Sequence, residues 1–238
     1  MPGAWLILPT YNEAENVESI VRAALPHLES TGLEHHILVV DDGSPDGTGQ
    51  IADRLAGELE TVEVLHRHHK QGIGPAYIAG FRHALAAGAD LLMEMDADFS
   101  HDPADLPRLI TAAAEADLVL GSRYVRGGGV TDWGLGRRIV SRGGSLYART
   151  VLGIPIDDLT GGFKCFRRAT LEGLDLTAVG TDGYGFQIEV TYRAVQAGYR
   201  VLEVPIVFRD RRVGSSKMSA RIAVEAFWKV PALRLHKP

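Results

Sequence analysis

The chain alternates between short runs of apolar residues and longer segments in which apolar residues recur every three or four positions. A short apolar run closed by a turn residue is typical of a buried β-strand, and the wider spacing is typical of a helix with one buried face. In the first half, strands are predicted at 5–8, 36–40, 62–65, 91–95 and 117–123, and helices after Asn12 and at 48–59, 72–87 and 103–116. This alternation predicts an α/β protein with a mostly parallel, doubly wound sheet, right-handed crossovers and helices on both faces.

Two of the predicted helices begin at recognisable capping residues. Asn12, with Glu15 three residues on, predicts the start of the first helix, because this spacing allows reciprocal capping of backbone N–H groups. Asp102 before Pro103 predicts the start of the helix after the fourth strand, since Asp is a good N-cap and proline is favoured in the first turn.

The rhythm changes after Arg123. A glycine loop at 127–129 precedes a predicted helix at 135–152, which is followed by a strand at 163–166, a helix at 186–197 and a strand at 201–208. No linker or internal repeat separates this half from the first, so we expect it to complete the same sheet and to add a lobe.

Four acidic residues follow two of the predicted strands: Asp41 and Asp42 after the second, Asp96 and Asp98 after the fourth. The carboxyl ends of parallel strands meet at the edge where open α/β sheets bind their ligands. Asp96 and Asp98 suit one Mg2+ or Mn2+ bound jointly with a substrate phosphate, because these ions prefer oxygen ligands. The alternative is that Asp98, like Asp102, only caps the following helix.

Later segments supply separated cations, namely Arg123, Arg137, Arg138, Arg211 and Lys217. Together with metal-binding acids, they predict a site for a nucleotide diphosphate, because the metal offsets negative charge and guanidinium groups bind phosphate oxygens in pairs. The alternative for each cation taken alone is a solvated surface position.

Composition excludes some classes of function. The 238 residues include 45% hydrophobic and 23% charged residues, which is ordinary for a globular protein. A net charge of -5 and a pI near 6.0 argue against a general nucleic-acid binder. The single Cys165 is expected to be a small core residue. No apolar stretch reaches the roughly 20 residues that span a bilayer, and no secretion signal is recognisable, so we expect a cytoplasmic protein, peripheral at a membrane at most.

Three histidines, His66, His68 and His69, lie together beside Arg67 and Lys70. They resemble a metal site in composition, but a polar surface loop is the preferred interpretation.

Seven motifs in this order identify a resemblance to the inverting GT-A glycosyltransferases of family 2, and within them to the dolichol- or polyprenol-phosphate mannose synthases. The motifs are PTYNE (9–13), VDDGSPDG (40–47), MDAD (95–98), GSRY (121–124), RRIVSRG (137–143), DLTGGF (158–163) and GSSK (214–217). The first three mark the broad family, and the later ones indicate the polyprenyl-phosphate branch. The resemblance implies a GT-A catalytic domain over 1–217, followed by a tail at 218–238.

The resemblance also implies roles for individual residues. The nucleotide-sugar site would comprise Pro9, Tyr11, Glu13, Val40, Asp42, Asp96, Ala97, Asp98, Arg123, Arg211 and Lys217. Asp96 and Asp98 would hold the metal, and Arg123, Arg137 and Ser141 would receive the phosphate of the acceptor. Asp98, Arg123 and Arg137 would be the catalytic residues. Ser100 stands where archaeal relatives carry a metal-binding Gln, so water would replace that ligand.

Two further residues, Gln187 and Glu189, match a helix that lines the acceptor side in relatives, although a helical Glu is usually solvated.

The implied reaction is transfer of mannose from GDP-mannose to a polyprenyl phosphate with inversion, giving polyprenyl-phosphate mannose and GDP. The product would be a lipid-linked mannose donor for glycan, glycolipid and glycoprotein assembly. A polyprenyl phosphate already carries an ionised nucleophilic oxygen, so we assign no catalytic base. The work of the enzyme would be positioning and charge stabilisation.

Membrane contact is expected, because the acceptor is a lipid. The tail at 219–235 mixes apolar and basic residues with Trp228. It either lies on the membrane as an amphipathic helix or packs back on the domain. A membrane-anchoring partner protein is a further source of contact. The resulting location is the inner face of the cell membrane.

Other readings stay open at this stage. One is transfer of glucose or N-acetylglucosamine to the same kind of lipid, because the sequence does not settle the sugar. Another is a non-catalytic nucleotide-binding module, since doubly wound sheets host many functions. A dinucleotide site is excluded, because no G-x-G-x-x-G follows the first strand.

Overall fold

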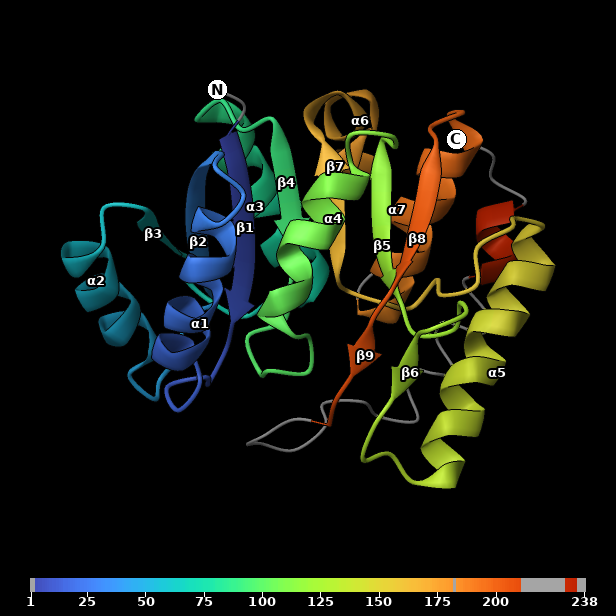
Figure 1. The fold of residues 1–238 in the computed structure, drawn as a ribbon, viewed down its shortest axis with the longest axis horizontal. Helices are drawn as coiled ribbons and strands as arrows, with labels where there is room; N and C mark the ends of the chain where they lie inside the picture. The colour runs from blue at the N-terminus through green and yellow to red at the C-terminus, as the bar shows by residue number, and fades with distance from the viewer. Residues whose placement is uncertain (1–2, 182, 211–229, 235–238) are drawn as a thin grey trace.

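The computed structural model describes residues 3–181, 183–210 and 230–234. Within them, a central seven-stranded sheet has the order β3-β2-β1-β4-β7-β5-β8, and β6 and β9 form a small second sheet (Figure 1). The strands are β1 Gly3–Thr10, β2 Glu34–Asp41, β3 Val62–His66, β4 Leu91–Glu94, β5 Leu118–Ser122, β6 Gly129–Val130, β7 Lys164–Arg167, β8 Val201–Pro205 and β9 Val207–Phe208. The predicted α/β class is confirmed.

Helices cover both faces of the sheet. They are α1 Val17–Glu29, α2 Thr48–Glu58, α3 Ile73–Ala86, α4 Leu106–Ala112, α5 Leu135–Leu152, α6 Arg168–Gly173 and α7 Tyr184–Gln196, with 3-10 turns at Pro103–Asp105 and Leu176–Ala178. Apolar residues of α1, α2 and α4 belong to one hydrophobic core, and those of α3, α5 and α7 belong to the other. Figure 1 shows α1 and α4 in front of the sheet and α7 behind it.

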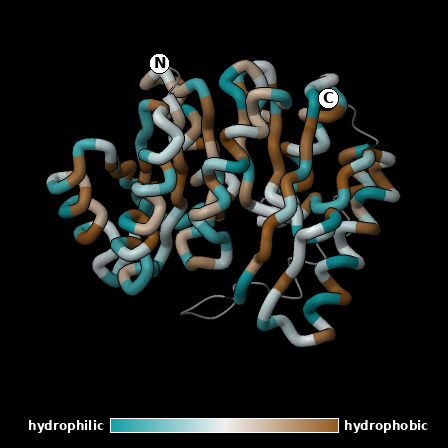
Figure 2. The backbone as a smooth tube through the Cα atoms, viewed as in Figure 1, coloured by the Kyte–Doolittle hydropathy of each residue, from teal (hydrophilic) through white to brown (hydrophobic). Residues whose placement is uncertain are grey.

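Successive residues of β1 explain why there are two cores. Leu6 and Leu8 pack with α1, whereas Ile7, between them, packs with α3. All three side chains are fully buried. A parallel strand covered on both faces is apolar throughout, which is the pattern that Figure 2 shows along the strands.

One strand differs from the expected parallel arrangement. β7 lies between β4 and β5 and is antiparallel to both. A buried strand has the same apolar pattern in either direction, so the sequence predicted this strand without its orientation. Because of this insertion, Lys164 of β7 stands directly opposite Glu94 of β4.

The predicted start of the first helix was wrong. Helix α1 begins at Val17, and Asn12 has a left-handed backbone with φ 56°. The backbone N–H groups of Asn16 and Val17 both donate to the carbonyl of Glu13, at 2.9 Å each. Residues 12–16 therefore form a turn that holds the last two residues of the PTYNE motif before the helix begins.

The prediction for Asp102 was correct. Its carboxylate accepts from the N–H of Ala104 at 3.0 Å, and Pro103 lies in the first turn. The following helix is shorter than predicted, because a 3-10 turn leads into α4, which ends at Ala112.

The final predicted strand is divided at Ile206 into β8 and β9. β9 leaves the main sheet and pairs in parallel with β6, which begins at Gly129. Of the predicted tail, the structure describes only 230–234, which is helical. There Val230 is buried in the core, and Arg234 donates to the carbonyl of Val151 at 2.6 Å. This part packs on the domain, and the prediction for the tail as a whole stays a prediction.

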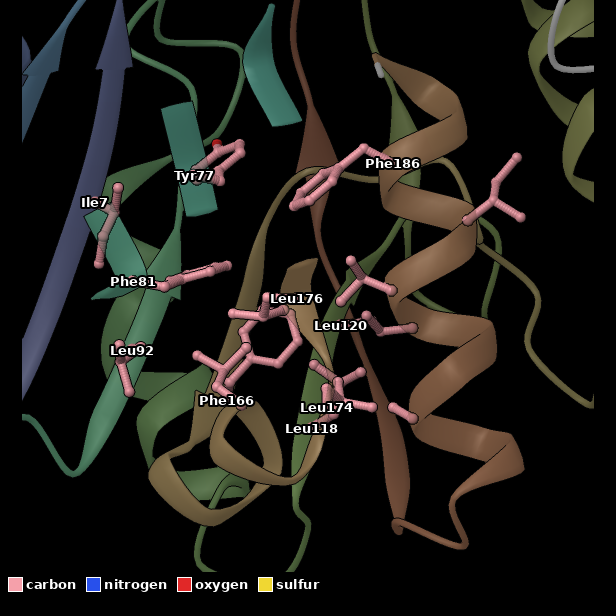
Figure 3. Close-up of a cluster of buried hydrophobic side chains, with 14 of the residues drawn as sticks. Ile7, Tyr77, Phe81, Leu92, Leu118, Leu120, Phe166, Leu174, Leu176 and Phe186 are labelled. Atoms are coloured by element: carbon pink, nitrogen blue, oxygen red, sulfur yellow. The ribbon is translucent and has the colours of Figure 1, made fainter. Parts of the chain in front are cut away.

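Aromatic rings join α3 to α7 below the acid-bearing edge. Tyr77 stacks on Phe186 with centroids 6.0 Å apart and an interplanar angle of 7°, and it also packs on Phe81. Phe81 meets Phe166 of β7 edge-on at 5.5 Å. Figure 3 shows Tyr77 and Phe186 facing each other from the two helices. This packing links α7 to α3 and, through Phe81, to β7.

Candidate active site at the carboxyl ends of the strands

Acidic residues from two strands meet at one edge of the sheet, as predicted. β1 pairs with both β2 and β4, so Asp42 and Asp96 follow strands on either side of β1. The N–H of Asp42 donates to the carbonyl of Thr10 at 3.0 Å, which extends the ladder to the strand mouth. Asp41, Asp42 and Asp98 are buried, and Asp96 is half-buried. This edge therefore concentrates negative charge.

The loop after β4 is held in shape by its own residues. The Asp98 carboxylate accepts from the N–H of Ser100 at 3.0 Å, and Phe99 between them has a left-handed backbone with φ 61°. His101 accepts the N–H of Asp96 on its Nδ1 at 3.3 Å, so its other ring nitrogen carries the proton. Sequence reasoning assigned no role to His101.

His101 is a buried, neutral histidine. Its ring stacks on Phe163 at 5.0 Å and meets Phe208 edge-on at 5.2 Å. Burial lowers the pKa of His101 to about 4. The neutral imidazole holds the backbone of the acidic loop in place by accepting the N–H of Asp96. No sequence signal beyond a polar residue in a turn indicated this role.

The chemistry of the donor set fits a divalent cation that is shared with a substrate. Asp96 and Asp98 offer oxygen ligands, and the hydroxyl of the buried Ser100 has no hydrogen-bond partner among the described residues. Burial, and then the charges of Asp96, Glu94 and Asp98, raise the pKa of Tyr77 well above its ordinary value. In the part of the chain that the structure describes, no group of three or more His, Cys, Asp or Glu side chains could hold a metal. Two carboxylates with substrate phosphates completing the shell suit Mg2+ or Mn2+.

The residues predicted for the nucleoside pocket lie at the ends of β1 and β2, and the loop after β3 packs beside them. Nη1 of Arg67 donates to the carboxylate of Asp42 at 2.5 Å, and Nη2 of Arg67 donates to the side-chain oxygen of Gln71 at 2.8 Å. Burial raises the pKa of Asp42, against the lowering effect of Arg67. The ammonium of Lys70 lies 4.2 Å from the ring centre of Tyr11. Sequence reasoning missed Arg67, which it had placed in a surface loop.

The other predicted residues of this pocket occupy different depths. Val40 is fully buried in the core and Ala97 is buried, whereas Pro9 is partly exposed. The N–H of Glu13 donates to the hydroxyl of Thr48 at 2.9 Å, which ties the PTYNE turn to the start of α2.

The histidine cluster is polar surface, as preferred above. His66, His68 and His69 are all exposed. His66 bonds to Asp53 at 2.8 Å, and this hydrogen bond raises the pKa of His66.

Arg123 is buried rather than solvated. Its guanidinium binds both carboxylate oxygens of Asp158 at 2.7 Å each and donates to Thr160 at 2.7 Å. The backbone N–H of Arg123 donates to the same carboxylate at 2.9 Å. Burial works to raise the pKa of Asp158, but the charge and hydrogen bonds of Arg123 outweigh it, so the pKa is lowered. The DLTGGF motif thus holds Arg123 in one position. The contact of Arg123 with a phosphate stays a prediction.

Two of the three predicted acceptor residues, Arg137 and Ser141, lie one turn apart on α5. Arg137 pairs with Asp210 at 2.8 Å and lies over the ring of Trp133 at 4.2 Å. Ser141, one turn later, accepts from the hydroxyl of Tyr124 at 2.7 Å. Tyr124 follows Arg123 directly, so the structure brings all three predicted acceptor residues near one another. The predicted Arg211 and Lys217 lie outside the described residues.

A buried polar cluster next to Asp96 was missed by sequence reasoning. Lys164 and Glu94 are both fully buried, and Lys164 donates to the backbone carbonyl and the side-chain oxygen of Gln187. Burial raises the pKa of Glu94 and lowers the pKa of Lys164. The signal was present, because a lysine within an otherwise apolar strand is rare unless it is paired.

Glu189 is not solvated, contrary to the usual expectation for a helical Glu. It is buried and accepts from the hydroxyl of Thr181 at 2.6 Å and from Arg193 at 2.9 Å. Its contacts anchor the start of α7. Cys165 is buried as expected, and burial raises the pKa of its thiol to about 12.

Residues 5–174 match the family model of glycosyl transferase family 2. The chain belongs to this family. It is 50% identical over 220 residues to an undecaprenyl-phosphate mannosyltransferase from Micrococcus luteus, covering 92% of this chain and 89% of that protein. It is 49% identical over 230 residues to a polyprenol monophosphomannose synthase from Mycolicibacterium smegmatis, covering 94% of this chain and 84% of that protein. The resemblance to polyprenol-phosphate mannose synthases is confirmed.

Solved structures confirm the GT-A fold. A mannosyltransferase from Pyrobaculum calidifontis, in complex with GDP-Man and Mn2+, superposes with a TM-score of 0.65 at 22% identity over 97% of this chain. The chain spans 64% of the length of that protein. A mannosyl-3-phosphoglycerate synthase from Rubrobacter xylanophilus superposes with a TM-score of 0.67 at 20% identity. The match covers 100% of this chain and 75% of that protein.

Across residues 3–181, 183–210 and 230–234, no helix is both long enough and apolar enough to cross a membrane.

Proposed function

We propose that the chain transfers mannose from GDP-mannose to a polyprenyl phosphate with inversion, giving polyprenyl-phosphate mannose and GDP. The observation that carries this proposal is identity of 49–50% over more than nine-tenths of the chain to two relatives named for polyprenyl-phosphate mannosylation. The choice of GDP as the donor nucleotide is our inference from the motifs of this branch.

The reaction requires no base from the protein. A phosphate oxygen of the acceptor attacks the anomeric carbon of mannose, and the bond from that carbon to the diphosphate breaks, with the electron pair leaving on GDP. The acceptor oxygen is already ionised at neutral pH, so in-line positioning and charge stabilisation supply the rate enhancement.

Each part of the site has a role in this proposal. Asp96 and Asp98 would hold Mg2+ or Mn2+, which offsets the charge of the departing diphosphate when bound. Arg123, held in a buried position by Asp158, would face a substrate phosphate. Arg137 and Ser141, one turn apart on α5, would receive the acceptor phosphate.

We further propose that the protein acts at the inner face of the cell membrane through α5. This helix exposes apolar side chains that are 56–74% accessible: Leu135, Ile139, Val140 and Leu146. The exposed Arg138 and Arg142 lie on the same helix. Figure 1 shows α5 along one side of the molecule, and Figure 2 shows apolar positions along it. Apolar and basic residues together suit an anionic lipid surface.

The test is transfer of labelled mannose from GDP-mannose into a solvent-extractable, mild-acid-labile lipid, with polyprenyl phosphate in detergent. We expect labelling with Mg2+ or Mn2+, none with a chelator, and none when labelled UDP-glucose replaces GDP-mannose. Labelling that survives the chelator would contradict the metal role. Transfer from UDP-glucose instead would establish the glucosyl alternative.

A further inference from the structure

The side-chain amide of Gln187 has a fixed orientation. Lys164 has only donors, so the amide oxygen of Gln187 must face its ammonium group. Both oxygens of the Glu94 carboxylate lack a hydrogen-bond partner among the described residues, and Glu94 stands opposite Lys164 in the strand pairing. The Lys164 ammonium group by itself excludes the flipped amide, which would bring an N–H group against it.

The fixed nitrogen borders the gap that the missing side chain of Gly162 leaves. A Cβ built on Gly162 would lie 3.4 Å from Nε2 of Gln187 and 3.8 Å from Oδ1 of Asp96. The amide nitrogen and the Asp96 carboxylate therefore face the same space, which a side chain at position 162 would fill. Gln187 itself is buried, with 4% of its surface exposed.

The sheet order indicates which part of a nucleotide sugar reaches this gap. The predicted nucleoside residues lie at the ends of β1 and β2, Asp96 follows β4, and β7 with Lys164 lies beyond β4. A donor whose diphosphate is bound at Asp96 and Asp98, with its nucleoside over β1 and β2, extends its sugar toward β7 and α7.

We propose that Gln187 is a contact residue for the donor sugar, donating an amide N–H to a sugar oxygen over Gly162, with Lys164 and Glu94 as positioning residues that aim the amide. This inference rests on the proposed function for the identity of the donor. The amide group has two N–H bonds, so it can serve Glu94 and the sugar at once.

The test compares the affinities of GDP and GDP-mannose in the presence of Mn2+ by calorimetry, without acceptor. Gln187→Met should weaken the binding of GDP-mannose about tenfold and change the affinity for GDP by less than about twofold. A hydrogen bond in a buried site contributes roughly a factor of ten to affinity. The matched control is Thr191→Val, which removes another buried polar group of α7 that bonds to the backbone of Gln187. It should leave the ratio of the two affinities unchanged. A purely structural role for Gln187 would weaken both ligands alike and would overturn the proposal.

A second variant tests the same gap if Gln187→Met does not fold. Gly162→Ala places a methyl group between the amide nitrogen and Asp96, at a backbone conformation that alanine can adopt. It should also weaken GDP-mannose selectively, by about tenfold or more. Equal affinities of wild type and Gly162→Ala for GDP-mannose would contradict the proposal.

The positioning role of the buried pair is tested by removing both charges. Glu94→Gln with Lys164→Met leaves no unpaired buried charge, and such replacements are often neutral for stability. The double variant should fold and show the same selective loss for GDP-mannose, because nothing then aims the amide. An unchanged affinity ratio would show that Lys164 does not act through Gln187. Failure of the function itself is distinguishable, since the wild type would then transfer no mannose.

Discussion

At the scale of single residues, the site is built from side chains that are held before any ligand arrives. Asp98 is fixed by the N–H of Ser100, and Arg123 is fixed by Asp158. Groups held in this way lose little freedom when a substrate binds, which favours catalysis by positioning. The Asp98 carboxylate and the Arg123 guanidinium group are therefore already positioned for a substrate, unlike the solvated charged groups at the surface.

Asp98→Asn should lower mannosyl transfer by at least about 100-fold, since an amide is a poor ligand for Mg2+ or Mn2+. The measurement is kcat/KM for GDP-mannose at saturating metal. Asp102→Asn is the matched control from the same loop, because the amide oxygen can still accept the capping hydrogen bond from Ala104. Equal activity in both variants would contradict the metal role.

Asp158→Asn should destabilise the protein by about 3 kcal/mol, because it leaves the buried Arg123 guanidinium without its counter-charge. Chemical denaturation measures this loss. The neighbouring Asp157→Asn is the control, and it should cost less than about 1 kcal/mol, since Asp157 pairs with Arg149 at the surface. Similar losses in the two variants would refute the role assigned to the buried pair.

The same pair predicts a pH dependence. The folded-state pKa of Asp158 is lowered, so its contribution to stability is fully present above its ordinary pKa, near pH 4, and is lost as the pH falls through the folded-state value. The unfolding free energy of Asp158→Asn should therefore fall less than that of the wild type between about pH 5 and pH 2. Parallel curves would contradict the assignment.

At the scale of elements, β7 and α5 add residues to the site that the strands bearing the acids do not supply. β7 enters antiparallel between β4 and β5 and brings Lys164 opposite Glu94. α5 carries Arg137 and Ser141 over the small β6–β9 sheet, and Arg138 donates to the carbonyl of Val130 in β6. The exposed apolar residues lie on this same helix, which would also bind the acceptor phosphate.

Ile139→Gln and Arg142→Gln on α5 should each weaken binding to vesicles of anionic phospholipid by roughly fivefold, because each removes an apolar or basic contact with the surface. Co-sedimentation with vesicles measures the effect. Arg82→Gln, at an exposed position of α3, is the matched charge control and should bind like the wild type. An effect at Arg82 as large as at Arg142 would argue against a specific membrane face.

At the scale of the whole molecule, the site lies at one edge of a sheet that is buried on both faces. Strands β2 and β4, on either side of β1, supply its acids, and the stacked rings of Tyr77 and Phe186 join α3 to α7. Ligand binding at this edge is therefore linked to the folding of the entire sheet, because the carboxylates come together only in the folded chain.

GDP with Mn2+ should raise the melting temperature, and a chelator should reverse most of the increase. At a ligand concentration of about 100 times Kd, the expected stabilisation is about 2.7 kcal/mol, or roughly 5–10 °C for a chain of this size. Differential scanning fluorimetry measures both shifts. A GDP-induced shift that the chelator leaves unchanged would contradict joint binding of metal and diphosphate.

The sequence by itself determined the order of strands and helices, the acids at two strand ends, the cap at Asp102 and the family. These features depend on local periodicity and on short motifs, which are contiguous in the chain. It failed at Asn12, because the turn at 12–16 depends on Glu13, Asn16 and Thr48 rather than on helix propensity.

Only the tertiary structure decided which charges are buried and what they face. The direction of β7, the pairing of Arg123 with Asp158 and the placement of Lys164 against Gln187 join residues that are 23 to 76 positions apart. A charged residue has the same identity in a sequence whether it is solvated or buried, and the cost of burial is met only by a partner that folding brings near. For that reason, the acidic edge was predictable, whereas for the buried polar cluster beside it the sequence indicated only that Lys164 needs a partner and not which residue that partner is.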